Sequence, residues 1–173
     1  MSEHPAAPES QYLRFQLGPD SFACDILQIR EILEYHRLTK VPQMPSFVHG
    51  VMNLRGTVVP VIDLAQRFGR PASAILRRSC IVILDAGEPD QRQSIGMLVD
   101  AAHEVINLTQ QDIMAPPAFG NPLRLDFIAG VVQHDAGFTL LLDMAQVLSV
   151  EEMASLAAPA ALQIKTESGC LMN

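Results

Sequence analysis

The 173-residue sequence contains no tryptophan, two tyrosines and seven phenylalanines. Because large aromatic side chains are so few, the core must be mainly aliphatic, and the eight methionines add adaptable packing surface. A chain of this length can bury roughly 70% of its unfolded surface, so it needs no disulfide or metal to hold a core. We expect one domain, or two small lobes packed together.

Positive charge and long apolar runs are also scarce. The 12 Lys and Arg residues against 19 Asp and Glu residues give a net charge of −7, which argues against nucleic acid or an anionic membrane as the main partner. No apolar run approaches the ~18 residues of a membrane span, and the first ten residues lack the features of a secretory signal. The three cysteines are widely separated and odd in number, which is typical of a reducing compartment. We therefore expect a cytoplasmic protein without direct membrane insertion.

Motifs for catalysis or metal binding are missing as well. The five histidines are scattered, and the sequence has neither the spacing of a metal site nor a nucleophile or phosphate-loop motif. Asp63 and Asp143 occupy equivalent positions of a repeat and could suggest a paired-carboxylate site. Each precedes a short helical segment, however, where Asp caps backbone N–H groups, and we favour that role. We expect no enzyme activity, no catalytic residues, no cofactor and no metal.

What the sequence does contain is a hairpin signal from Phe47 to Leu64. Two β-rich runs flank Arg55-Gly56, a pair suited to a tight reversal because Gly tolerates positive φ. Pro60 lies in the second run and lacks the N–H that a central strand needs, which predicts an edge strand or a bulge. The hairpin would place the long cation of Arg55 beside an open backbone edge. This arrangement suits a docking surface, and an ordinary solvated turn is the alternative.

The pattern recurs eighty residues later. The segment 127–131 matches 47–51, and the segment 142–146 matches 62–66. Two matched hairpins at a constant offset indicate an internal duplication, which with two copies means a pair of similar subdomains. Many short strands joined by turns, with few helices, predict small antiparallel barrels or sandwiches with a groove between them.

The pattern also predicts how the chain is divided. We expect a flexible N-terminal arm at 1–11, one domain at 12–158 with subdomains at about 12–69 and 79–148 and a terminal helix at about 149–158, and a flexible tail at 159–173.

The segment Asn53-Leu54-Arg55-Gly56-Thr57-Val58-Val59-Pro60-Val61-Ile62-Asp63-Leu64 resembles the signature hairpin of CheW-type chemotaxis coupling proteins. The similarity extends from Tyr12 to about Leu148 and includes the segments 25–32 and 96–100. It implies a mainly β fold of two five-stranded SH3-like barrels, with a few short helices, around a shared hydrophobic centre.

The resemblance also implies a function. Such a protein is a non-enzymatic adaptor that joins the cytoplasmic hairpin tip of a chemoreceptor, a methyl-accepting chemotaxis protein, to a CheA-type histidine kinase. It would be recruited to receptor arrays at the inner face of the membrane. The chain has no ATP-binding motif and no room for a receiver domain, so a stand-alone coupling protein is the expected type.

Carried over from the family, the receptor-contacting positions fall on Ile29, Glu31, Gly50 and Arg55. Ile29 would supply apolar contact, although ordinary core packing is an equally open interpretation, and Gly50 would allow close backbone approach. Arg55 can form a bidentate bond to a carboxylate, while Glu31 can pair with a receptor cation or with Arg55 itself. The second repeat has no Arg-Gly tip, so we expect the first lobe to be the receptor face. Kinase-binding residues are not assigned.

Two alternatives remain from the sequence. The chain could be a CheW-like scaffold of a non-motility chemosensory pathway, or a small enzyme or ligand-binding β-barrel whose groove holds a metabolite. The second alternative predicts a closed polar pocket with a perturbed titratable group, for which the sequence offers no candidate.

Overall fold

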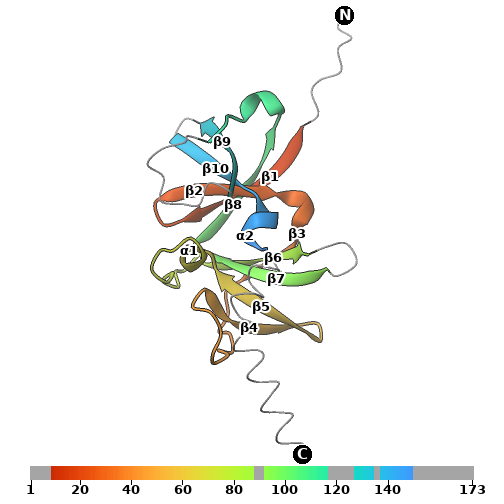
Figure 1. Ribbon diagram of the computed structural model, residues 1–173, viewed down its shortest axis with the longest axis vertical. Helices are drawn as coiled ribbons and strands as arrows, with labels where there is room; N and C mark the ends of the chain where they lie inside the picture. Colours follow the sequence, from red (N-terminus) through yellow and green to blue (C-terminus); the bar gives the residue numbers. More distant parts are fainter. Residues whose placement is uncertain (1–8, 88–91, 117–126, 135–136, 150–173) are drawn as a thin grey trace, which may run out of the picture.

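The computed structural model describes residues 9–87, 92–116, 127–134 and 137–149, which form two five-stranded sheets and a few short helices (Figure 1). The predicted mainly β fold of two five-stranded barrels is confirmed. Figure 1 shows the two sheets one above the other, with both α-helices near the level where they meet.

The strands of each sheet come from both halves of the chain. Sheet A contains, in spatial order, β8 (Ala101–Leu108), β1 (Ser10–Leu17), β2 (Asp20–Asp25), β10 (Gly137–Leu142) and β9 (Ile128–His134). Sheet B contains β3 (Ile29–Glu34), β6 (Cys80–Ala86), β7 (Gln93–Val99), β5 (Thr57–Asp63) and β4 (Val48–Leu54). The helical segments within the described ranges are η1 (Ile26–Gln28), α1 (Leu64–Arg67), η2 (Gln110–Asp112) and α2 (Met144–Val147).

The internal duplication organises this topology. Strands β1 to β5 with α1 form the first repeat, and β6 to β10 with α2 form the second. Replacing each strand of sheet B by its repeat equivalent gives the order of sheet A. Each barrel therefore consists of three strands from one repeat and the opening hairpin of the other. The predicted subdomains at about 12–69 and 79–148 correspond to the sequence repeats and do not coincide with the two sheets.

Because each barrel contains the opening hairpin of the other repeat, each sheet also contains one parallel strand pair. Strand β2 pairs with β10 in parallel, and β5 pairs with β7 in parallel, whereas the sequence predicted antiparallel barrels. A parallel pair cannot be closed by a tight turn, and here each pair joins strands of different repeats. The remaining ladders are antiparallel, including the predicted β4–β5 hairpin.

Of the two alternatives predicted from Pro60, the edge strand was wrong, because β5 lies inside sheet B between β7 and β4. The β4–β5 ladder does contain a bulge next to the proline, between Val48 and Gly50. Pro60 faces Val51 in the β4 ladder, and the pairing of β5 with β7 begins only at Val61. The Val51 N–H donates to the carbonyl oxygen of Thr39 at 2.8 Å, and the Thr39 N–H donates to the carbonyl oxygen of Val51 at 3.1 Å. The backbone groups of Val51 thus point away from Pro60, as expected where two facing residues exchange no hydrogen bonds. The proline thus sits just beyond the β7 ladder, and the edge of β4 is partly covered by Thr39.

The chain ends differ slightly from the predicted boundaries. Strand β1 begins at Ser10, so the last two residues of the predicted arm belong to a strand. The predicted tail at 159–173, and all of the predicted terminal helix except Ser149, lie outside the described residues.

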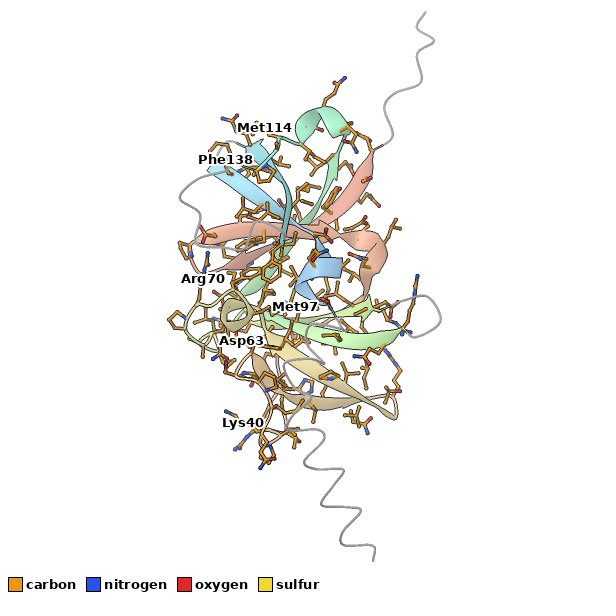
Figure 2. The ribbon with its side chains drawn as sticks, viewed as in Figure 1. Lys40, Asp63, Arg70, Met97, Met114 and Phe138 are labelled. Atoms are coloured by element: carbon orange, nitrogen blue, oxygen red, sulfur yellow. The ribbon has the colours of Figure 1, made fainter. Side chains whose placement is uncertain are left out.

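The described residues form three hydrophobic cores, which hold the fold together. One fills the interior of sheet B, including Val59, Ile81 and Ile83, and a smaller one lies in sheet A. The third and most extensive core lies between the barrels and draws residues from both sheets and both α-helices. Met97, near the middle of the molecule in Figure 2, belongs to this central core. This central core fills the space between the barrels, where the sequence suggested a groove.

Aromatic residues are concentrated in the central core despite their scarcity. Phe22, Phe68 and Phe127 form a chain of ring contacts with centroid distances of 5.4 and 5.8 Å. The guanidinium of Arg67, which is buried, lies 4.8 Å from the centroid of the Phe127 ring and 5.5 Å from that of its repeat equivalent, Phe47. Such cation–π contacts become stronger when they are shielded from water.

The carboxylates of Asp63 and Asp143 cap the two α-helices, which confirms their predicted role. Each Oδ1 accepts from the two backbone N–H groups at positions two and three further on, at 3.0 and 3.4 Å for Asp63 and at 3.1 and 3.4 Å for Asp143. Asp63 is fully buried and also accepts bonds from the backbone N–H and the hydroxyl of Ser73, both at 2.8 Å. It therefore fixes the segment that links the two repeats as well as its own helix.

Because Asp63 accepts more hydrogen bonds than Asp143, replacing each by alanine should lower the free energy of unfolding by different amounts. Asp143→Ala should lower the free energy of unfolding by about 1 kcal/mol, the usual loss of a helix cap. Asp63→Ala should lower it by about 3 kcal/mol, because the Ser73 donors also lose their partner. Urea unfolding curves of the two variants measure the difference. Equal losses would contradict the role of Asp63 as an anchor of the linking segment.

Candidate functional site

The tip of the β4–β5 hairpin places Arg55 in solvent. Arg55 and Gly56 both have positive φ, 51° and 86°, which is the requirement of the two-residue reversal that matches strand twist. Asn53 Oδ1 accepts the Gly56 N–H at 2.9 Å and closes the turn. The Arg55 side chain, 73% exposed, projects from this rigid turn.

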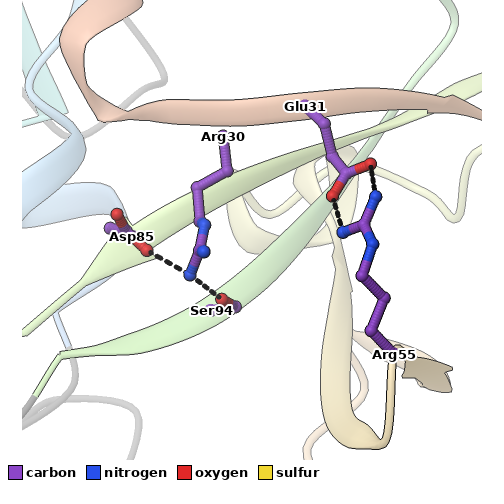
Figure 3. A network of polar contacts seen from close by, with 5 residues as sticks. All are labelled: Arg30, Glu31, Arg55, Asp85 and Ser94. Atoms are coloured by element: carbon purple, nitrogen blue, oxygen red, sulfur yellow. Dashed lines mark hydrogen bonds and ion pairs between the residues drawn. The ribbon is translucent and has the colours of Figure 1, made fainter.

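Arg55 does not point freely into solvent but pairs with Glu31 on β3. Nη1 donates to Oε2 at 2.5 Å and Nη2 donates to Oε1 at 3.1 Å, which is a bidentate bond (Figure 3). The hydrogen bonds from Arg55, reinforced by its charge, lower the pKa of Glu31 below its ordinary value. Of the four residues predicted for the site, the structure brings these two together.

A bulge in β3 presents Arg30 beside Glu31. Ile29 faces Leu84 and Glu31 faces Ile83, so Arg30 is the extra residue in the ladder with β6. Bulges commonly redirect side chains at sheet edges. Arg30 Nη1 donates to Asp85 Oδ1 at 3.4 Å and to Ser94 Oγ at 3.3 Å (Figure 3).

Sequence reasoning missed Arg30, Asp85 and Ser94. Asp85 and Ser94 face each other in the β6–β7 hairpin of the second repeat, and exchange of the opening hairpins brings them beside β3 of the first. Arg30 lies next to the predicted Glu31, but the bulge that directs it has no sequence signature here.

These side chains line a groove of about 620 Å³, which we call the hairpin-tip groove. Its residues come from β3, the β4–β5 hairpin and the β6–β7 hairpin: Arg30, Glu31, Leu54, Arg55, Thr57, Val58, Val59, Pro60, Asp85, Arg92, Gln93 and Ser94. The three arginines and two carboxylates leave it one positive charge, in a protein whose net charge is −7. Val58, 66% exposed, adds an apolar surface.

Ile29 and Gly50 lie outside the lining of this groove. Ile29 is half-buried and packs against the central core, which agrees with the core-packing interpretation. A Cβ on Gly50 would lie 2.7 Å from the backbone oxygen of Thr39 and 2.9 Å from Leu38 Cβ. The close backbone approach at Gly50 is therefore made by the chain's own segment. Gly130, its repeat equivalent, is crowded in the same way by Ile113 and Met114.

The other barrel has a related pair with a different geometry. Glu104 lies on β8, the repeat equivalent of β3, and accepts a bidentate bond from Arg14 at 2.6 and 3.0 Å. Hydrogen bonding from Arg14 lowers the pKa of Glu104 to about 2. Arg14 belongs to strand β1 rather than to a hairpin tip. On sheet B the arginine that binds the glutamate comes from a hairpin tip, whereas on sheet A it comes from a strand.

Within the described residues there is no group of three or more His, Cys, Asp or Glu side chains placed to hold a metal ion. In the same part of the chain, no helix is long and apolar enough to cross a membrane.

The structure defines a duplicated SH3-like barrel protein with exchanged hairpins and a charged surface groove. The family model of the CheW-like domain matches residues 11–152, and the chain belongs to this family.

Named relatives support this assignment. Chemotaxis protein CheW of Klebsiella aerogenes is 32% identical over 144 residues, covering 83% of this chain and 84% of that protein. Chemotaxis protein CheW of Thermotoga maritima is 29% identical over 146 residues, covering 83% and 90%. The crystal structure of the scaffolding protein TtCheW from Thermoanaerobacter tengcongensis superposes with a TM-score of 0.70 at 30% identity, covering 83% of this chain and 89% of that one.

The pairing of Glu31 with Arg55 predicts a measurable titration. Because the folded-state pKa of Glu31 is lowered, the pair persists below the ordinary value of 4.5 and breaks as the pH falls through the folded-state pKa. Arg55→Gln should raise the pKa of Glu31 toward 4.5, as followed by NMR of the side-chain carboxyl group. The pKa of Glu104, held by Arg14, serves as the internal control and should not change. An unaltered Glu31 titration would show that Arg55 does not hold it in solution.

The crowding at Gly50 predicts a loss of stability that is independent of any partner. Gly50→Ala should lower the free energy of unfolding by about 1–3 kcal/mol, because the new methyl group meets backbone atoms of Thr39 that cannot move aside cheaply. Gly130→Ala is the matched variant and should cost a similar amount, because its new methyl group would lie 2.4 Å from Cγ2 of the β-branched Ile113 and 3.2 Å from the backbone oxygen of Met114. Denaturant unfolding of both variants tests these losses. Wild-type stability of Gly50→Ala would refute the structural explanation.

Proposed function

We propose that this protein is a non-enzymatic adaptor that couples the cytoplasmic tip of a chemoreceptor to a CheA-type histidine kinase. The observation that carries the proposal is the arginine at the β4–β5 tip, held by Glu31, in a member of the CheW-like family. Its named relatives are chemotaxis proteins, and its structural relative is a scaffolding protein.

The hairpin-tip groove suits a helical receptor segment. A helix can lay apolar side chains against the exposed Val58 while its polar side chains reach the arginines at the rim. The guanidinium of Arg55 has five N–H donors, and the bidentate bond to Glu31 engages two of them. Glu31 therefore holds the guanidinium of Arg55 in place, while the remaining N–H donors of Arg55 are available for a receptor carboxylate or backbone carbonyl.

Coupling two partners requires a second surface. Met114, 42% exposed, and Phe138, 57% exposed, lie at the end of the molecule opposite Lys40 (Figure 2). They belong to the barrel of sheet A, away from the hairpin-tip groove. Apolar surface of this kind fits a kinase regulatory domain of related fold, bound at the same time as the receptor. The assembly would form in the cytoplasm, at receptor arrays on the inner face of the membrane.

Charge reversal at the tip tests the receptor contact. Arg55→Glu should weaken binding of a receptor-tip fragment by more than ~1.4 kcal/mol, which is tenfold in affinity, and leave the fold intact. Calorimetric titration measures the affinity, and retained binding of the kinase regulatory domain serves as the folding control.

A charge-swapped variant separates recognition from hairpin positioning. Arg55→Glu combined with Glu31→Arg restores an ion pair between the same positions. If the receptor contacts Arg55 itself, the double variant stays weak. Recovery of wild-type affinity would instead show that the pair serves only to position the hairpin. Failure of the wild-type chain to form a ternary complex with kinase and receptor fragments would overturn the proposed function.

A further inference from the structure

We infer that Arg30 is a second anion-binding residue of the hairpin-tip groove, and that the segment bound there is an acidic helix carrying two carboxylates on one face. One carboxylate would meet Arg55 and the other Arg30. This inference rests on the proposed function and specifies the chemistry of the receptor segment.

The first support is the position of Arg30. The bulge between Ile29 and Glu31 directs Arg30 into the groove next to the residue that holds Arg55. Had the ladder been regular, Arg30 would alternate with Glu31 and face the other side of β3. Bulges at sheet edges are used to redirect side chains. Two arginines from separate elements therefore line one groove.

The second support is the difference between the contacts of the two arginines. Arg55 binds Glu31 through two nitrogens at 2.5 and 3.1 Å, whereas both contacts of Arg30 use a single nitrogen, Nη1, at 3.3 and 3.4 Å. Nε and Nη2 of Arg30 make no hydrogen bond to a described residue, and the side chain is 58% exposed. A partner carboxylate can bind this fork without displacing a strong bond.

The third support is the charge around the groove. Arg30, Arg55 and Arg92 exceed the two carboxylates of the lining. The lining thus carries a net positive charge in a protein whose net charge is −7. Such a surface attracts a negatively charged partner and repels a basic one. An acidic segment is therefore the occupant that the groove favours.

The test compares two charge reversals in the full-length chain. Arg30→Glu and Arg37→Glu change the net charge equally, but Arg37 lies outside the groove. With a receptor-tip fragment as the probe, Arg30→Glu should weaken binding by about tenfold or more and Arg37→Glu by less than about threefold. The milder Arg30→Gln, whose fold is checked by thermal unfolding, should lose about fivefold and bind with a weaker dependence on salt.

A double-mutant cycle identifies the contact. Each acidic residue of the receptor fragment is changed to its amide in turn and titrated with wild type, Arg30→Gln and Arg55→Gln. Two different carboxylates should show coupling, one with each arginine, by a factor of about five. Equal effects of Arg30→Glu and Arg37→Glu, or no carboxylate coupled to Arg30, would overturn the inference while wild-type binding upholds the proposed function. No binding by the wild-type chain would overturn both.

Discussion

The fold depends on the central core that the two barrels share, and Arg67 shows how completely it is enclosed. This cation is buried between Phe47 and Phe127, which are equivalent residues of the two repeats, and its Nε donates to the carbonyl oxygen of Val147 at 2.9 Å. Val147 is itself the repeat equivalent of Arg67. The arginine thus joins α1 to α2 where the repeats meet. A buried cation is costly unless its surroundings compensate, so this contact requires both repeats to be in place.

Exchange of the opening hairpins extends this dependence to the functional surface. Each sheet needs two strands from the other repeat, so neither repeat can complete its barrel alone. The hairpin-tip groove is assembled in the same way, since Glu31 and Arg55 come from the first repeat and Asp85 and Ser94 from the second. The two barrels differ in the origin of one residue. Both hold a glutamate on an outer strand with a bidentate arginine, but on sheet B that arginine comes from a hairpin tip.

Local signals in the sequence predicted local features of the structure. The Arg55-Gly56 reversal and the caps at Asp63 and Asp143 follow from side-chain chemistry within a few residues, and all are present. The repeat was recognised from matching segments, and the strand order of the two sheets follows it. The family resemblance gave the twin barrels, and the possible pair of Glu31 with Arg55 was recognised. The exchange of hairpins, the parallel ladders and the bulge at Arg30 were not predicted, because they depend on pairing between strands far apart in the sequence. For the same reason the sequence did not reveal that Thr39 lies against Gly50, and the receptor contact assigned to Gly50 stays a prediction.

The pairing of Glu31 with Arg55 has two opposing effects on the affinity for a partner. It fixes a long, rotamer-rich side chain before binding, which reduces the entropy lost on association. It also neutralises that side chain, so an incoming carboxylate must share a guanidinium that already has one. Arg30 differs because its contacts are longer and made through one nitrogen, which leaves more of its positive charge unscreened. Arg55, which is held in place and neutralised by Glu31, selects a partner by its geometry, and the less constrained Arg30 attracts a negatively charged partner. Together they discriminate between partners by shape and by charge, which neither would achieve alone.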